Sequence, residues 1–327
     1  MSRIPFARIS RSWGLRKKLR LVEDTNNRAF IVRSDVGLYV LKRDYSKEKT
    51  AEELRRLSSF LLDRGFNVPV AIFTPDGRPD VKIGKHTYSL FSYLEGEKAD
   101  KSLSNANPEM AFEFGSFTGK FHLCLETASA VTLPRSNLLR TLSSSVRVLF
   151  SKAKSMSCFD RDTLESFFSD FYSIYYCLPV QIVHGDFHPG NIIIKEGRVS
   201  GVIDFEYAAR EVKVLDIAYL VASVLTEFHR MGAPSLALYL IPYFLDGYCQ
   251  SNTLSVEERK SIVYILASIL LNQLYVFTVD GKRDEAVFVE SILKWVIDSK
   301  ARIMERTALT YLQSKEHLDL LPASPHH

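Results

Sequence analysis

The sequence predicts an α+β protein with two lobes, a small N-terminal β-sheet lobe with one helix and a larger, mainly helical C-terminal lobe. Short apolar runs separated by turn residues dominate residues 19–94, whereas most of the chain beyond residue 95 has the 3.6-residue periodicity of helices. The length of 327 residues also exceeds the usual size of a single domain. With 46% hydrophobic and 24% charged residues, the composition is that of an ordinary globular protein.

Four short apolar runs bounded by turn residues predict the strands of the N-terminal lobe: 29–32, 38–41, 68–73 and 86–91. The first two runs are separated by Arg-Ser-Asp-Val-Gly and read as a hairpin. Between the second and third runs, residues 44–65 are expected to form a helix, because leucines recur there at helical spacing and Gly65 lies where a helix-ending glycine is expected. These elements give a small sheet that carries one helix.

Long helical segments follow the Glu95-Gly96 pair. The clearest predicted helices are 110–125, 160–176, 217–228, 235–248, 256–277 and 284–310. A strand-like island lies in the middle of them, at 180–183, 192–195 and 199–203. The larger lobe is therefore expected to be helical around a few short strands.

One apolar segment, residues 261–279, is nearly long enough to span a bilayer. Ser268, Asn272 and Gln273 would then lie near the middle of the hydrocarbon, where polar groups are costly. We therefore expect a buried core helix and no stable membrane association.

Residues 1–18 are predicted to be a basic N-terminal tail and residues 313–327 a C-terminal tail. The first twenty residues carry seven basic side chains and no acid: Arg3, Arg8, Arg11, Arg16, Lys17, Lys18 and Arg20. Such a segment could contact anionic lipid or RNA, but a solvated terminus is the more common case. The formal net charge of the chain, +4, is too small to require a nucleic-acid partner.

The N-terminus lacks the continuous apolar stretch of a secretion signal, and the four cysteines show no CxxC pair or metal-ligand spacing. Both observations favour a cytoplasmic protein with reduced thiols. The prediction of no nucleic-acid partner and no membrane anchor is consistent with that location.

The strand-like island contains the motif that carries the chemistry. The run is His184-Gly185-Asp186-Phe187-His188-Pro189-Gly190-Asn191, followed by Gly201-Val202-Ile203-Asp204-Phe205. An Asp, then an Asn after four intervening residues, then an Asp after a later strand is the order found in kinases. Asp is also common at turns after strands, but turn capping does not explain all three residues at this spacing.

The sequence motif HGDxHPGN resembles that of the aminoglycoside phosphotransferase, choline kinase and homoserine kinase superfamily of protein-kinase-like small-molecule kinases. The resemblance extends over residues 21–295 and is strongest over 182–220. It implies a protein-kinase-like two-lobe fold, with a nucleotide-binding lobe at 19–94 and a catalytic and substrate lobe at 95–312. It also implies transfer of the γ-phosphate of ATP or GTP, with Mg²⁺, to the hydroxyl of a small molecule.

The resemblance gives each motif residue a role that suits its chemistry. Asp186 is the expected base, because a carboxylate can orient the acceptor hydroxyl and take its proton. Asn191 and Asp204 are the expected metal ligands, since Mg²⁺ prefers hard oxygen ligands. His184 and His188 are expected to brace the loop.

Leu215-Asp216-Ile217-Ala218 resembles a further motif of the superfamily. Asp216 is expected to be structural, either accepting hydrogen bonds from the backbone of the catalytic loop or capping the following helix.

In the N-terminal lobe, Lys42 ends the run Tyr39-Val40-Leu41-Lys42, which resembles the strand whose lysine binds the α- and β-phosphates. A lysine at a strand end is ordinarily a solvated charge. The acid-bearing helix that follows favours the functional interpretation, with Glu53 as the expected ion-pair partner of Lys42. Glu52 stays open as the alternative, because the sequence does not determine the helix phase to one residue.

Two further segments are expected to bind nucleotide. Thr25, Asn26 and Asn27 lie in a polar hairpin that lacks the GxGxxG of protein kinases, and they either contact phosphate or form a simple turn. The hinge between the lobes is placed at residues 92–96. Backbone groups of Ser92 and Leu94 would bind the adenine edge and Phe91 would line the pocket behind it, although these residues could equally be plain core.

Three functions remain as alternatives. The leading one is a small-molecule kinase; the others are a catalytically weak nucleotide-binding relative of spore-coat or scaffold type and a protein Ser/Thr kinase. The missing glycine loop and the short segment after Asp204 disfavour a protein kinase. From residue 226 onward twelve acids face ten Lys and Arg. This near balance favours a homoserine-like amino acid, an amino alcohol or a sugar over a polycationic aminoglycoside as the acceptor.

Overall fold

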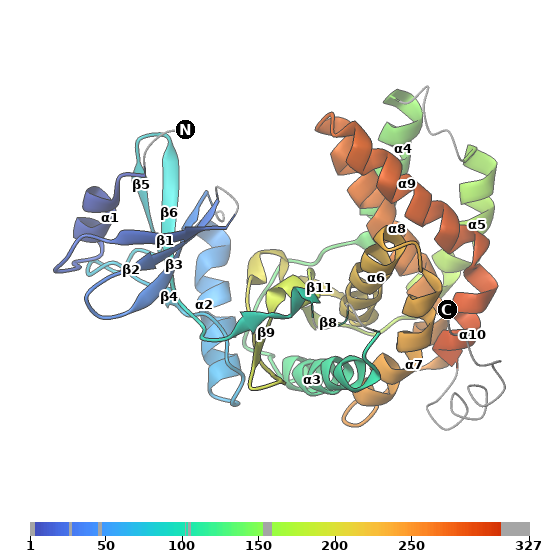
Figure 1. Cartoon of the computed structure of the whole chain (residues 1–327), viewed down its shortest axis with the longest axis horizontal. Coiled ribbons are helices and arrows are strands. Elements are labelled where there is room, and N and C mark those ends of the chain that lie inside the picture. Colours follow the sequence, from blue (N-terminus) through green and yellow to red (C-terminus); the bar gives the residue numbers. More distant parts are fainter. Residues whose placement is uncertain are drawn as a thin grey trace, which may run out of the picture. The chain divides into compact units, whose positions relative to one another are not determined.

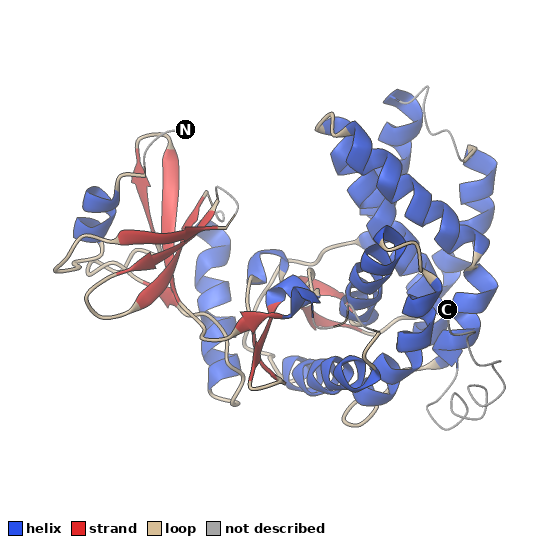
Figure 2. Cartoon of the chain, viewed as in Figure 1, coloured by secondary structure: helices blue, strands red, loops and turns tan. Residues whose placement is uncertain are grey.

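The computed structural model describes residues 4–25, 28–44, 48–101, 103, 106–152 and 159–308. The chain divides into two compact units (Figure 1). The first, the sheet unit, consists of Met1–Glu97, Ala128–Leu133 and Asn191–Ala208, and the second, the helical unit, contains the other residues. Figure 2 shows strands concentrated in the first and helices in the second, which confirms the predicted α+β class.

The sheet unit contains an antiparallel six-stranded sheet. Its strands are β1 (Arg20–Asp24), β2 (Ala29–Arg33), β3 (Leu38–Arg43), β4 (Ala71–Ile72), β5 (Asp80–Ile83) and β6 (His86–Ser92). Their order is β1-β2-β3-β6-β4, and β5 also pairs with β6. Helix α2 (Glu48–Leu62) is the single long helix among the described residues of this unit, and it buries Leu54, Leu57 and Leu61 as their spacing predicted. β1 and β5 were not predicted, because all residues of β1 are exposed and β5 has only two apolar residues, the buried Val81 and Ile83.

The basic N-terminal segment differs from the predicted solvated tail. Residues Phe6–Ser12 form helix α1. Ile9 and Trp13, one helical turn apart, are buried in the core of the sheet unit, and the Trp13 indole Nε1 donates a hydrogen bond of 2.6 Å to the Ile72 carbonyl. Arg8 and Arg11 remain exposed on the opposite face. Charge counting missed this amphipathic pattern because seven basic residues outweigh the few apolar residues that face inward.

Two smaller sheets contain the predicted strand-like island. β7 (Glu97–Lys98), β9 (Ile192–Lys195) and β10 (Arg198–Val202) form a three-stranded sheet in the order β10-β9-β7. β8 (Val180–Val183) pairs with β11 (Ala209–Val212) in the helical unit. The second pair was missed in part, because β11 lies in a stretch that contains Arg210 and Glu211.

The helical unit consists of eight helices among its described residues. They are α3 (Pro108–Glu126), α4 (Leu138–Lys152), α5 (Arg161–Tyr175), α6 (Val214–Arg230), α7 (Ser235–Tyr248), α8 (Val256–Val279), α9 (Arg283–Asp298) and α10 (Lys300–Ala308). The predicted helix 284–310 is two helices, since the chain turns at Ser299. The predicted C-terminal tail, 313–327, lies outside the described residues.

Helix α8 is the one helix of the described chain long and apolar enough to cross a membrane. It packs against α4, α5, α6, α9 and α10, and Ile262, Ile265 and Leu270 are completely buried. These contacts confirm the prediction of a core helix.

Helices α3 and α7 approach so closely that only glycine fits between them. A Cβ atom on Gly247 would overlap the Phe112 carbonyl of α3, and one on Gly115 would overlap the Phe244 carbonyl of α7. We expect Gly247→Ala to lower the free energy of unfolding by roughly 1–3 kcal/mol, the usual cost of overpacking. Denaturant titration measures this loss. Ala301→Leu, which adds more volume at an exposed helical site, is the control, and equal stability of the two variants would contradict the prediction.

Candidate active site

The loop that carries Asp186 is held by a buried carboxylate. Asp216, in the first turn of α6, accepts the His184 N–H at 2.8 Å through Oδ2 and the Gly185 N–H at 2.9 Å through Oδ1. The His184 ring is buried, and its Nδ1 accepts the Asp186 N–H at 3.3 Å. Asp216 thus fixes the backbone directly after β8, from which Asp186 projects.

The Asp186 carboxylate is partly exposed, with 29% of its side chain accessible, and the His188 Nε2 lies 3.6 Å from it. The His188 Nδ1 accepts the Gly190 N–H at 3.1 Å, which orients the ring. A Cβ atom on Gly190 would lie 2.6 Å from the Asp100 Oδ1 atom, so the glycine allows this close approach. Asp186, His188 and Asp100 therefore share one side of the loop.

These three side chains line a pocket of about 470 Å³ in the helical unit. Its other walls come from α6, α8 and α9 and include Tyr219, Gln273, Phe277 and Phe288. Glu227, Arg230 and Glu285 also lie in the lining, and Arg230 pairs with Glu227 at 3.1 Å. The pocket thus gathers four carboxylates against one guanidinium.

The pocket is more acidic than the sequence predicted. The near balance of acids and bases after residue 226 gave no reason to expect an acidic wall. Folding brings Glu227 and Glu285 together with Asp100 and Asp186, two acids that the count did not include. Residues far apart in sequence create a local charge that no segment total reveals.

In the sheet unit, Asn191 and Asp204 lie at the same end of the β9–β10 hairpin. Ile192 pairs with Val202 in the hairpin, and the next backbone bond runs from the Ile203 N–H to the Asn191 carbonyl at 2.9 Å. Asp204 follows directly, in the left-handed conformation with φ 70°. This conformation is uncommon for a residue other than glycine and clusters at functional sites.

Lys42 extends from β3 to Asp204, with the ammonium Nζ 2.6 Å from the carboxylate Oδ1. The same Nζ lies 5.9 Å from the centre of the Phe91 ring. Lys42 of β3, Phe91 of β6 and Asp204, which follows β10, therefore meet within the sheet unit.

The predicted Lys42–Glu53 ion pair is not present. Glu53 accepts the Thr132 N–H at 2.7 Å and lies 3.5 Å from Arg56 instead. Glu52, the alternative, pairs with Arg55, whose hydrogen bond lowers the pKa of Glu52 to about 2. Both acids thus bind other groups: Glu52 pairs with Arg55, and Glu53 accepts the Thr132 N–H. Lys42 pairs with the carboxylate of Asp204 instead.

The predicted hinge residues Ser92 and Leu94 differ in whether their backbone N–H groups are hydrogen-bonded. The Ser92 N–H donates to the Val70 carbonyl at 2.9 Å, and the Ser92 hydroxyl accepts the Val70 N–H at 2.9 Å. The Leu94 N–H has no hydrogen-bond partner among the described residues. Ser92 is therefore engaged in holding the strand edge, and Leu94 is the better hinge candidate of the two.

The predicted phosphate loop is described only at its edges. Thr25 closes the β1–β2 turn, since its N–H and its hydroxyl both donate to the Ala29 carbonyl, at 3.1 and 2.9 Å. Asn26 and Asn27 lie outside the described residues.

The described residues contain no group of three or more His, Cys, Asp or Glu that could hold a metal ion. Mg²⁺ in kinases needs only one or two protein oxygens, because phosphate and water complete its shell. The side chains of Asn191 and Asp204 are of this chemical type, an amide oxygen and a carboxylate.

Sequence reasoning missed several residues around the site. Asp100, Glu227 and Glu285 carry no motif and come together only through the fold. The sequence contained only a weak indication of His122, which contacts Asp216, and of Tyr248, which contacts His122. His122 shares one helix face with the buried Thr118 and Gly115, where an imidazole needs polar partners.

Comparison with known proteins places the chain in a family. Residues 18–248, most of the chain, match the profile of the family described as "Phosphotransferase enzyme family". The chain belongs to this family. It is thus a phosphotransferase with an alcohol group as acceptor, a small-molecule kinase with the protein-kinase-like fold.

Two curated relatives are homoserine kinases. The one from Zymomonas mobilis is 25% identical over 258 residues, which cover 77% of each chain. The one from Neisseria meningitidis is 28% identical over 239 residues, which cover 72% of this chain and 73% of the relative.

Solved structures share the fold of this phosphotransferase at lower identity. An aminoglycoside phosphotransferase from Alicyclobacillus acidocaldarius is 17% identical, with a TM-score of 0.64 over 93% of this chain and 97% of its own. The amicoumacin kinase hAmiN, solved with AMP-PNP and Ca²⁺, has a TM-score of 0.61 at 17% identity, over 86% of this chain and 88% of its own.

Proposed function

We propose that this phosphotransferase moves the γ-phosphate of ATP or GTP to the hydroxyl of a small amino-bearing alcohol, with a homoserine-like amino acid as the first candidate. The observation that carries the proposal is the pocket of the helical unit, which combines the partly exposed Asp186 with three further carboxylates and Arg230. A carboxylate at that position can orient the acceptor hydroxyl and accept its proton as the oxygen attacks.

Asn191 and Asp204 are the proposed metal ligands, and Mg²⁺ is the proposed ion. A bound divalent cation neutralises charge on the phosphate oxygens in such transfers. The chain's own contribution is to hold the two ligands at one end of a hairpin, with Asp204 in a conformation that its neighbours must maintain. Lys42 is the proposed phosphate contact, and its pairing with Asp204 keeps the ammonium close to the ligand pair.

The remaining nucleotide contacts are proposed from the sheet unit. Residues 19–94 would form the nucleotide-binding lobe, with the Leu94 N–H at the adenine edge and Phe91 in the wall of its pocket. Residues 95–312 would form the catalytic and substrate lobe. His184, His188 and Asp216 are the proposed supports of the catalytic loop.

The composition of the acceptor pocket supports an ammonium-bearing substrate. Glu227, Glu285 and Asp100 offer carboxylates to a cationic group, and Arg230 offers a guanidinium to a carboxylate. An amino acid with a side-chain hydroxyl has both groups, and two curated relatives are named for homoserine. The excess of carboxylates also supports a second candidate, an aminoglycoside, which is a polycation.

A side-by-side acceptor screen tests the proposal. L-homoserine, ethanolamine, choline and kanamycin are each incubated with ATP or GTP and Mg²⁺, and phosphorylated product is measured by mass spectrometry. We expect the highest kcat/KM with homoserine. L-2-aminobutyrate, which lacks the hydroxyl, is the control and should inhibit competitively without being phosphorylated.

The outcomes separate the alternatives. Preferential phosphorylation of kanamycin would establish the second candidate. Metal-dependent nucleotide binding without transfer to any acceptor would favour a catalytically weak nucleotide-binding protein. Transfer to serine residues of a protein would instead favour a protein Ser/Thr kinase.

For the acceptor itself, we expect Glu285→Gln to raise the KM of an ammonium-bearing acceptor about fivefold and to change kcat little. The expected loss is that of one solvent-exposed ion pair, at most about 1 kcal/mol. Steady-state kinetics with the best acceptor of the screen measures it. Glu305→Gln, on the exposed surface of α10, is the matched control, and identical KM values for both variants would remove Glu285 from the acceptor site.

A further inference from the structure

A buried histidine connects three elements of the helical unit behind the catalytic loop. His122, in α3, is completely inaccessible to solvent. Its Nε2 lies 3.0 Å from Asp216 Oδ2, and its Nδ1 lies 3.0 Å from the Tyr248 hydroxyl of α7. The His122 carbonyl also accepts the side-chain amide of Gln181, in the strand that leads into the catalytic loop, at 3.1 Å.

The partners determine which ring nitrogen carries the proton. Asp216 already accepts two backbone N–H groups, and as a carboxylate it can only accept, so the His122 Nε2 must donate to it. Burial, together with the charges of Glu258 and Asp216, raises the pKa of Tyr248 far above its usual range. Its hydroxyl therefore keeps its proton and is able to donate to Nδ1, 3.0 Å away. The neutral imidazole with hydrogen on Nε2 satisfies both contacts.

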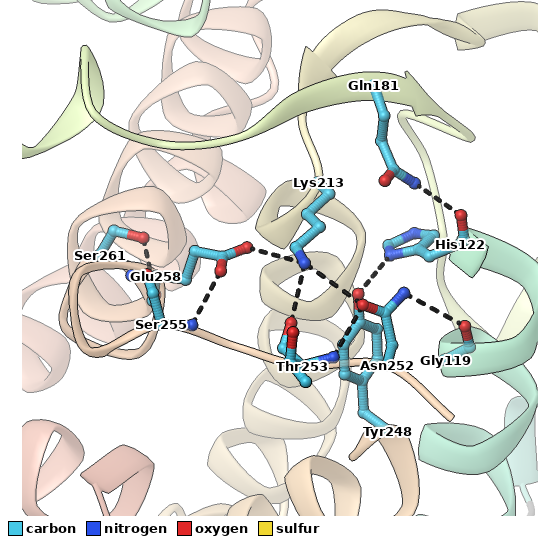
Figure 3. A network of polar contacts seen from close by, with 10 residues as sticks. All are labelled: Gly119, His122, Gln181, Lys213, Tyr248, Asn252, Thr253, Ser255, Glu258 and Ser261. Carbon is cyan, nitrogen blue, oxygen red and sulfur yellow. Dashed lines mark hydrogen bonds and ion pairs between the residues drawn. The ribbon is translucent and has the colours of Figure 1, made fainter. Parts of the chain in front are cut away.

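The end of α7, which carries Tyr248, adjoins a partly buried polar network (Figure 3). Lys213 Nζ lies 2.8 Å from the Thr253 carbonyl and 3.4 Å from Glu258, which caps the start of α8. Asn252 connects this group to α3 through the Gly119 carbonyl at 3.4 Å. The network anchors the chain immediately after α7 and so holds Tyr248 at the end of that helix.

We infer that His122 is a positioning residue for phosphoryl transfer. As the Nε2-protonated neutral imidazole it links Tyr248 to Asp216, and through Asp216 it fixes the His184–Gly185 turn from which Asp186 projects. This inference rests on the proposed role of Asp186 as the base. His122 does not touch the acceptor pocket, so its effect is on the orientation of the catalytic carboxylate.

Two substitutions of similar size separate this role from simple filling of the core. In His122→Gln the side-chain amide nitrogen can occupy the position of Nε2 and keep donating to Asp216. In His122→Asn the shorter amide reaches only the Nδ1 position, toward Tyr248. We expect His122→Gln to keep kcat within threefold of the parent, and His122→Asn to lower it by about tenfold or more, the effect of one charge-assisted hydrogen bond.

The KM values for nucleotide and acceptor should stay within twofold in both variants, because neither binding surface is altered. The acceptor used is the best one of the screen above. His86→Gln, at a surface histidine that pairs with Asp44, is the control and should behave as the parent. Equal kcat values for His122→Asn and His122→Gln in folded protein would overturn the inference.

A second measurement needs no variant activity. In the intact protein labelled with ¹⁵N-histidine, ring correlations should show one histidine, absent from the His122→Gln spectrum, with hydrogen on Nε2 and an unprotonated Nδ1 between pH 6 and 8. Hydrogen on Nδ1 would overturn the proposed linkage whatever the acceptor is. The expected tautomer together with failure of every acceptor would instead place the error in the proposed function.

Discussion

Asp186→Asn should lower kcat at least about 100-fold and leave nucleotide affinity nearly unchanged, because the substitution removes the proposed base while keeping the size of the side chain. The Asp186 N–H would still donate to His184, so the loop should keep its shape. Single-turnover kinetics and nucleotide titration measure the two quantities.

A neighbouring carboxylate provides the control. Asp100→Asn removes an equal charge from the same pocket and is expected to raise the KM of the acceptor while kcat falls by less than about tenfold. Near-normal turnover in Asp186→Asn, or equal kcat losses in the two variants, would show that Asp186 is not the base.

The second large effect is expected at Asp204. Asp204→Gly should lower turnover at least about 100-fold, because a metal ligand contributes several kcal/mol to transition-state stabilisation. Its stability should stay within about 1 kcal/mol of the parent, since glycine relieves the left-handed backbone at φ 70° while the partly exposed pair with Lys42 is lost. Thermal unfolding and kinetics over a range of Mg²⁺ concentrations measure both effects.

Asn191→Ala distinguishes the ligand role from a general defect. It should raise the Mg²⁺ concentration needed for half-maximal activity, and the double variant with Asp204→Gly should be no worse than Asp204→Gly alone, because the two residues act as one unit. Activity that does not depend on a divalent cation would contradict the assignment of both ligands.

The sequence by itself determined the family, the α+β class and the order of the motif residues. The kinase-like motif of Asp, Asn and Asp could be recognised because it is local in the sequence. Asn191 and Asp204 flank a single hairpin, so their proximity does not depend on long-range folding. Core helix α8 could also be predicted, since polar residues within its apolar run argued against a membrane. The helix at Phe6–Ser12 was missed, because its buried pair of Ile9 and Trp13 is short and surrounded by basic residues.

Only the tertiary structure decided the partners of the charged groups. Lys42 meets Asp204 and not Glu53 because long-range folding brings residues 162 positions apart within hydrogen-bond distance, which no helical phase can predict. The proposed acceptor pocket acquires its negative charge in the same way, from Asp100, Glu227 and Glu285 on separate elements. Local patterning encodes which residue types follow one another, whereas electrostatic interactions depend on distance in space, and that distance is set by the packing of strands and helices.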